Sequence, residues 1–140
     1  MLNQVLIPLN IRNKNNRIYT YNELKDKVNS EYYGQIGFDD NTEISLSNIS
    51  HQVLNIRFEN NKLIGDVKIL NTEKGKILNN LIKSGIEYVF RPRSLGSISE
   101  DGYAKIDMIV SFDAILLKED TFFSLKNERK KKLEKLSKIW

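Results

Sequence analysis

The side chains that could perform chemistry are one histidine, two serines and one aspartate. His51 is the only histidine among the 140 residues, and Ser94 or Ser97 with Asp113 could complete a nucleophile, base and orienting-carboxylate set with it. Such a set performs acyl transfer, because the histidine takes the serine proton while the carboxylate orients the imidazole. The alternative is structural: a lone histidine at the start of an apolar-flanked strand more often serves as a hydrogen-bonding residue, since paired titratable groups are what mark a site.

Six short motifs follow one another along the chain in a fixed order. They occupy residues 13–19, 34–38, 50–53, 65–70, 93–96 and 112–114. Together they resemble the prohead core proteases of tailed bacteriophages, whose fold is related to the herpesvirus assemblin. The resemblance spans residues 10–117 and depends on the order and spacing of the motifs, because each one is degenerate; Thr20, for example, stands where the family usually has proline.

The resemblance implies a histidine base and a serine nucleophile, and this sequence departs from both. Phe38 stands at the position of the base, and Arg91 and Pro92 stand at the positions of two serines, of which the first is the nucleophile. A phenyl ring cannot take a proton, and neither replacement can attack a carbonyl. A serine protease without its triad keeps only about a thousandfold to ten-thousandfold advantage over water. We therefore expect a protease fold without protease activity.

The sequence is compatible with two other functions. If residues 88–97, which read as an active-site loop, align differently, the chain is an active, divergent maturation protease that uses His51, Ser94 and Asp113. Asp113 could equally pair with Arg91 or Arg93. The other alternative is a small nucleic-acid-binding module that contacts nucleic acid through its basic tail and whose affinity would fall steeply with salt. Against this alternative, the sequence has no interleaved aromatic and basic strand face that could stack bases.

The first predicted elements are a helix and a hairpin. Thr20 and Glu23 form a capping box, and Leu24, Val28 and Tyr32 recur at four-residue spacing, which predicts a helix ending near Gly34. Residues 53–58 alternate apolar and polar, residues 59–62 are turn formers, and residues 63–70 are rich in β-branched side chains. This pattern predicts a β-hairpin, with Gly65 marking a bulge or a close approach.

A second helix and two strands complete the expected fold. Thr72 can cap a helix that ends at Gly85 and carries an apolar stripe of Ile77, Leu78, Leu81 and Ile82. Residues 87–90 and 103–117 read as strands. The fold class is α+β: a mixed, mainly antiparallel sheet or small barrel flanked by helices, with a basic C-terminal helix. We expect a prohead-protease-like domain over residues 1–122 and an amphipathic tail over residues 123–140.

Composition narrows the function classes. The chain has no cysteine, which excludes disulfides and thiolate metal sites and fits a reducing cytoplasm. We expect no cofactor and no metal. The N-terminus lacks the basic region of a signal peptide, and no apolar run is long enough to span a membrane.

The charge of the chain is concentrated in its tail. Residues 126–140 hold seven Lys or Arg against two Glu, a local charge of +5, so the first 125 residues carry −1 of the total of +4. Leu133, Leu136 and Trp140 recur at helical spacing, which predicts a helix with one apolar edge. The residues expected to bind a partner are Phe122, Phe123, Arg129, Lys130, Lys131, Lys132 and Trp140.

The expected function is that of a structural or assembly component of a phage virion, assembled in the host cytoplasm. Its partners would be capsid, portal, neck or tail proteins, with homo-oligomers and nucleic acid as further candidates for binding. A sheet edge beside Arg91 would offer a second contact, because a former substrate groove can receive an extended chain by strand addition.

Overall fold

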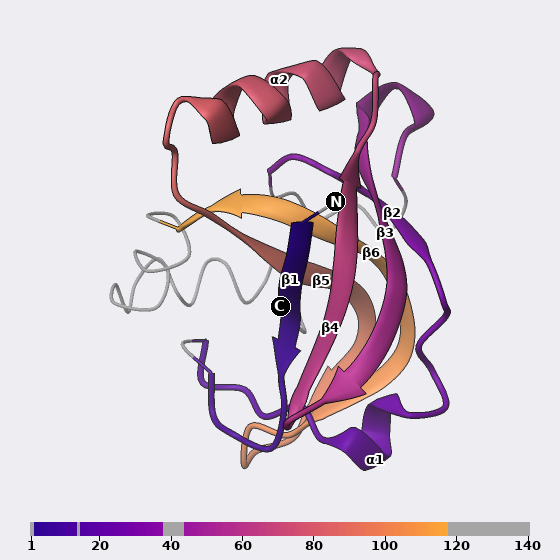
Figure 1. Ribbon diagram of the computed structural model, residues 1–140. Coiled ribbons are helices and arrows are strands. Elements are labelled where there is room, and N and C mark those ends of the chain that lie inside the picture. Colours follow the sequence, from indigo (N-terminus) through magenta and orange to yellow (C-terminus); the bar gives the residue numbers. More distant parts are fainter. Residues whose placement is uncertain (1, 14, 38–43, 118–140) are drawn as a thin grey trace.

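Antiparallel strands dominate this protein. The computed structural model describes residues 2–13, 15–37 and 44–117. A four-stranded sheet has the order β1-β4-β3-β2, and a long hairpin is formed by β5 and β6 (Figure 1). The strands are β1 (Leu2–Pro8), β2 (Tyr32–Gln35), β3 (Ile49–Glu59), β4 (Lys62–Ile69), β5 (Tyr88–Ile98) and β6 (Ala104–Leu116). The helical segments are α1 (Tyr21–Leu24), the 3-10 turn η1 (Leu46–Asn48) and α2 (Glu73–Lys83).

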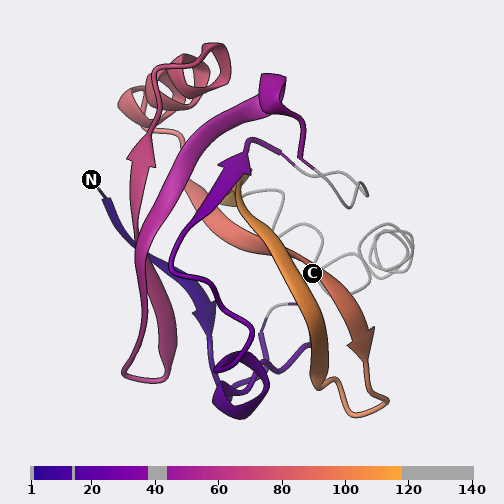
Figure 2. The same ribbon diagram turned by 90° about the vertical axis from the view of Figure 1, so that its right-hand side faces the viewer.

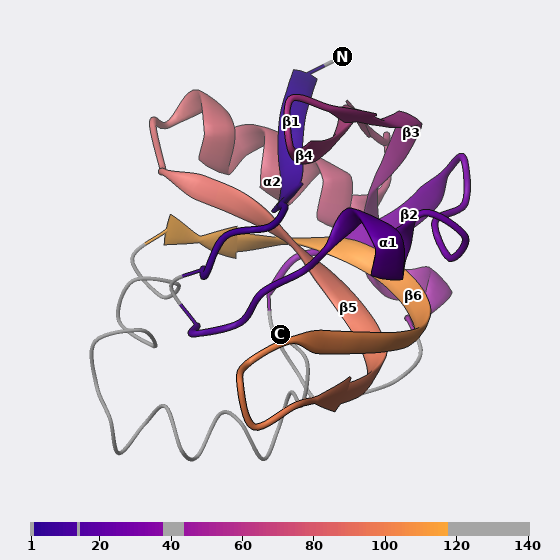
Figure 3. The same cartoon turned by 90° about the horizontal axis from the view of Figure 1, so that it is seen from below.

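The sheet and the hairpin wrap around one core. A parallel bridge joins Ile36, just after β2, to Ala114 on β6, and β1 lies beside β5 on the other side (Figures 2 and 3). In Figure 1, α2 lies across one end of the strands and α1 lies at the other. The core draws fully buried side chains from both halves, among them Leu6, Val53 and Phe112. The expected sheet-dominated α+β fold is confirmed; the basic C-terminal helix and the boundary at residue 122 lie outside the described residues.

The predicted β3–β4 hairpin is confirmed. Asn60 and Asn61 form its turn with φ of 51° and 59°, the backbone that a tight two-residue turn between twisted strands requires. The close approach expected at Gly65 is also present, because a Cβ there would lie 2.8 Å from Val53 Cγ1. The irregularity in register falls on the facing strand, between Leu54 and Arg57.

The second predicted helix is confirmed as α2. Its N-cap Thr72 accepts from the Gly75 N–H at 2.9 Å and donates to the Ile49 carbonyl at 2.6 Å, which ties the helix to the start of β3. Leu78 is buried, whereas Ile77 is 42% exposed. The buried stripe is therefore narrower than the predicted one.

The first predicted helix is wrong beyond its first turn. Thr20 caps it as expected, but α1 ends at Leu24. Tyr32 and Tyr33 belong to β2, where they pair with β3, because a long-range ladder outweighs a local periodicity. The capping box is also incomplete: the Glu23 carboxylate accepts from the Ile106 N–H at 2.6 Å instead of returning to the cap.

The active-site loop expected at residues 88–97 is a strand. β5 runs from Tyr88 to Ile98 and pairs with β6 along its whole length, with two register shifts. The strand prediction for residues 87–90 was too short, and that for residues 103–117 is confirmed by β6. No helix in the described part of the chain is long and apolar enough to cross a membrane.

Candidate functional site

His51 lies on β3 with both ring nitrogens in hydrogen bonds. The ring is 0% exposed. Nε2 lies 2.7 Å from the carbonyl oxygen of Phe112, and Nδ1 lies 2.7 Å from the hydroxyl of Ser50. Because a carbonyl can only accept, Nε2 carries the proton and Nδ1 accepts from Ser50. The ring is thereby fixed in one tautomer.

Gly34 on β2 makes this contact between β3 and β6 sterically accessible. It pairs in register with His51, and a Cβ on it would lie 2.2 Å from His51 Nε2 and 2.1 Å from the Phe112 oxygen. Only glycine leaves room there for the imidazole to reach β6. The ring also packs edge-on against Phe90, with 5.1 Å between centroids. His51, on β3, therefore lies against β2 and contacts both strands of the β5–β6 hairpin.

Burial lowers the pKa of the His51 imidazole from 6.5 to about 4, and the hydrogen bond to Phe112 opposes this effect only in part. The ring is neutral at neutral pH. Its contact with Ser50 has the length of a nucleophile–base hydrogen bond, but Ser50 is also 0% exposed. A general base must reach the proton of a group that contacts substrate. This buried pair has no such access.

Asp113 on β6 is paired with Arg93 on β5. Arg93 Nε and one of its terminal nitrogens lie 2.8 Å and 2.6 Å from the same carboxylate oxygen, and the two side chains are 8% and 3% exposed. The other carboxylate oxygen of Asp113 accepts two hydrogen bonds, one from the Ser111 hydroxyl at 2.9 Å and one from the Gln35 N–H at 3.3 Å. Burial raises the pKa of Asp113, while Arg93 and these hydrogen bonds act in the opposite direction. Of the two pairings expected for Asp113, the one with Arg93 is present.

Ser94 and Ser97 lie on β5 in different surroundings. The Ser94 hydroxyl is buried and has no hydrogen-bond partner within the described ranges. Ser97 is exposed and lines a polar pocket described below. The hydrogen bonds of His51 go to Ser50 and Phe112, so the structure joins neither serine to it. The predicted triad is not assembled through hydrogen bonds here.

No family model matches the chain, and no curated protein matches it. The solved structure of the bacteriophage T4 capsid assembly protease, gp21, superposes with a TM-score of 0.69 at 15% sequence identity. The match covers 81% of this chain and 79% of that one. The fold resembles that of a phage capsid assembly protease.

In this protease-like fold, the positions that the sequence motifs assign to the protease serines lie in the middle of a paired strand. Pro92 pairs in register with Phe112 on β6. The Phe112 carbonyl faces His51, away from β5, so this pair occupies a non-hydrogen-bonded site of the ladder. Proline is tolerated there because the ladder needs no N–H from it.

Arg91, the residue at the nucleophile position, is half-buried on the same strand. It pairs in register with Asp113, although the carboxylate is bonded to Arg93, and its Nη1 donates to the Phe90 carbonyl at 3.1 Å. Phe38, at the position of the protease base, lies outside the described residues. So do the predicted partner-binding residues of the tail.

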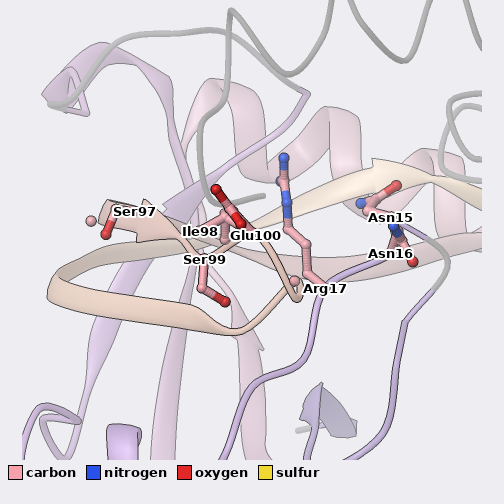
Figure 4. A pocket seen from close by; sticks show the side chains of 9 residues that line it. Asn15, Asn16, Arg17, Ser97, Ile98, Ser99 and Glu100 are labelled. Atoms are coloured by element: carbon pink, nitrogen blue, oxygen red, sulfur yellow. The ribbon is translucent and has the colours of Figure 1, made fainter.

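A polar pocket brings together two motifs that lie far apart in the sequence. It has a volume of about 610 Å³ and is lined by Asn15, Asn16, Arg17 and residues 96–100 and 102. Figure 4 shows Arg17 between Glu100 and the two asparagines. Arg12 holds this corner, because its guanidinium donates to the Asn16 side chain at 3.1 Å and to the Asp101 carbonyl at 3.0 Å. The motif at residues 13–19 thus serves as a turn that is fastened to the β5–β6 hairpin.

The sequence could not have revealed the roles of Gly34 and Ser50. Both matter because of contacts with residues on other strands or with the buried ring. Ser50 was part of a motif, but its hydroxyl could have pointed either way. Across the described segments, no group of three or more His, Asp or Glu side chains could hold a metal ion.

Proposed function

We propose that this protein is a catalytically inactive relative of the phage capsid assembly proteases and acts as a structural or assembly component of a phage virion. The observation that carries the proposal is the state of its one histidine. His51 is buried, neutral and hydrogen-bonded through both nitrogens to groups that substrate cannot reach. In this role it stabilises the fold and takes no part in proton transfer.

The remaining polar groups support the same proposal. Asp113, the candidate orienting carboxylate, is neutralised by Arg93, and the candidate nucleophile Ser94 lacks an activating partner in the described chain. At the positions that the motifs assign to the protease serines, Arg91 and Pro92 lie within β5. An acyl-transfer enzyme needs an activated nucleophile and backbone donors for the oxyanion. Arginine and proline supply neither a nucleophile nor, at Pro92, a backbone donor.

As an assembly component, the protein would contact other virion proteins through its C-terminal tail and through a sheet edge. The basic residues Arg129, Lys130, Lys131 and Lys132 suit an acidic partner surface. Phe122 and Phe123, at the start of the tail, are candidates for the apolar anchors that hold it in place, because buried aromatic side chains dominate interface energetics.

The test combines an activity assay with a measurement of the protein content of mature virions. Purified protein should cleave neither itself nor a mixture of capsid scaffold proteins, and it should not react with a serine-directed phosphonate probe. Quantitative mass spectrometry of mature virions should find the chain intact at a fixed ratio to the portal and major capsid proteins. Labelling at Ser94 that disappears in a Ser94→Ala variant, or recovery only as fragments cut at one site, would overturn the proposal in favour of an active protease.

A further inference from the structure

An apolar groove lies where α2 meets the ends of β2, β5 and β6. It has a volume of about 300 Å³. Among the described residues that line it, every side chain is aliphatic except that of Tyr88. Ile86 and Leu116 form part of it and are each 39% exposed. A groove of this kind favours an apolar occupant, because covering its walls removes apolar surface from water.

The described chain ends beside this groove. Leu116, in the groove wall, is followed by Leu117, whose N–H donates to the Glu87 carbonyl at 3.1 Å. This bond holds the end of β6 next to Ile86, another residue of the wall. Whatever follows Leu117 therefore starts at the edge of the groove.

The sequence after Leu117 supplies a suitable occupant. Residues 118–121 are polar, and the next apolar side chains are Phe122, Phe123 and Leu125. Five extended residues span up to about 17 Å, so Phe122 is within reach of a groove whose wall includes Leu116. A segment tethered this closely has an effective concentration on the order of millimolar. A free partner would have to exceed that concentration to compete at equal affinity.

We propose that residues 121–125 of the same chain dock in this groove, with Phe122 and Phe123 as the inserted side chains. The seven Lys and Arg of residues 126–140 then start from a fixed point beside α2 and remain available to an acidic partner. The phenylalanines would thus anchor the tail to its own domain, and the basic residues would make the outside contact. The inference holds whether or not the protein has peptidase activity.

The absence of cysteine allows a direct test by disulfide trapping. The double variant Ile86→Cys/Phe122→Cys places one thiol in the groove wall and one on the docked segment. The matched control is Lys83→Cys/Phe122→Cys, since Lys83 is the last residue of α2 and does not line the groove. Both full-length proteins are oxidised at micromolar concentration with glutathione disulfide and analysed by non-reducing electrophoresis and mass spectrometry.

We expect an intrachain disulfide in the groove variant that forms at least about tenfold faster than in the control, because the docked thiols are held within bonding distance. Equal rates in the two variants would overturn the proposal. A disulfide-linked dimer whose yield falls on dilution would also overturn it and would assign the groove to the tail of a second copy. If the reduced Ile86→Cys protein unfolds at a lower temperature than wild type, Leu116→Cys, at equal exposure, replaces it and the same outcomes decide.

Discussion

His51 Nε2 and the carbonyl oxygen of Phe112 lie 61 residues apart in the sequence and 2.7 Å apart in the structure. The contact passes over Gly34, the one position on β2 where a side chain would block it. It joins the four-stranded sheet to the β5–β6 hairpin through a buried, neutral imidazole. The stability of the fold should therefore depend on this contact in ways that can be measured.

Replacing Gly34 with alanine should destabilise the protein by about 3 kcal/mol. The added Cβ would displace His51 or Phe112, which costs packing energy and leaves buried polar groups without partners. Chemical unfolding measures the change. The control is Gly37→Ala, where no atom of a described residue other than its chain neighbours lies within 4 Å of the new Cβ and only the φ of +88° is unfavourable, so that the cost should be about 1 kcal/mol. Equal costs at the two positions would contradict the steric explanation.

The pH dependence of stability should carry the signature of His51. Below pH 6.5 the unfolded chain binds a proton at this residue, whereas the folded protein does not until about pH 4. The unfolded state thus binds more protons in this window, so stability is fully present above pH 6.5 and falls towards pH 4. The difference corresponds to about 3 kcal/mol.

Unfolding by urea at several pH values between 4 and 7.5 tests this prediction. The His51→Gln variant serves as the control, because it removes the only histidine and leaves the carboxylates, Asp113 included, to titrate as before. The variant should be less stable at neutral pH and should have a flatter profile between pH 4 and 6.5. Parallel profiles for the two proteins would show that His51 does not titrate as described.

Neutralising Asp113 should be costly because it leaves a buried guanidinium without its counter-charge. Asp113→Asn should lower the free energy of unfolding by about 3 to 5 kcal/mol. Asp107→Asn, on the same strand but exposed, should change it by less than about 0.5 kcal/mol. If Asp113 instead served only to orient a catalytic histidine, its substitution would remove activity and leave stability nearly unchanged.

Ser94 should tolerate the loss of its hydroxyl. Its oxygen is buried without a partner in the described structure, so Ser94→Ala should be neutral or stabilise the protein by up to about 1 kcal/mol. Ser111→Ala removes a buried hydroxyl that donates to Asp113 at 2.9 Å and should cost about 1 to 2 kcal/mol. Thermal unfolding of the two variants side by side compares these costs. A destabilised Ser94→Ala variant would indicate that the Ser94 hydroxyl makes a hydrogen bond.

Local signals in the sequence predicted the elements that depend on local chemistry. The two asparagines at 60 and 61 defined the β3–β4 turn, and Thr72 with Gly85 defined the ends of α2, because turns and caps are formed by the residues that make them. The four-residue spacing of Leu24, Val28 and Tyr32 was misleading. Tyr32 pairs with Val53 on β3, and nothing within residues 20–34 encodes that partner.

The candidate site was harder to predict because the contacts of its residues depend on the register between distant strands. The sequence identified His51 and Asp113 as the residues of interest and allowed a structural role for each. It could not show that the histidine bonds a backbone carbonyl on β6, since that depends on how two distant strands align and on glycine at position 34. The motif at residues 88–97 predicted an active-site loop, whereas these residues form part of the continuous strand β5.

The hydrogen bond accepted by the Glu23 carboxylate affects how other copies of the protein could pair with β6. By accepting the Ile106 N–H at 2.6 Å, it occupies a backbone donor of β6 that no neighbouring strand uses. An unpaired row of such donors would offer a template on which other chains could stack into fibres. Here the Glu23 side chain from the α1 turn occupies one such donor, so that this position of β6 is not available to an added strand.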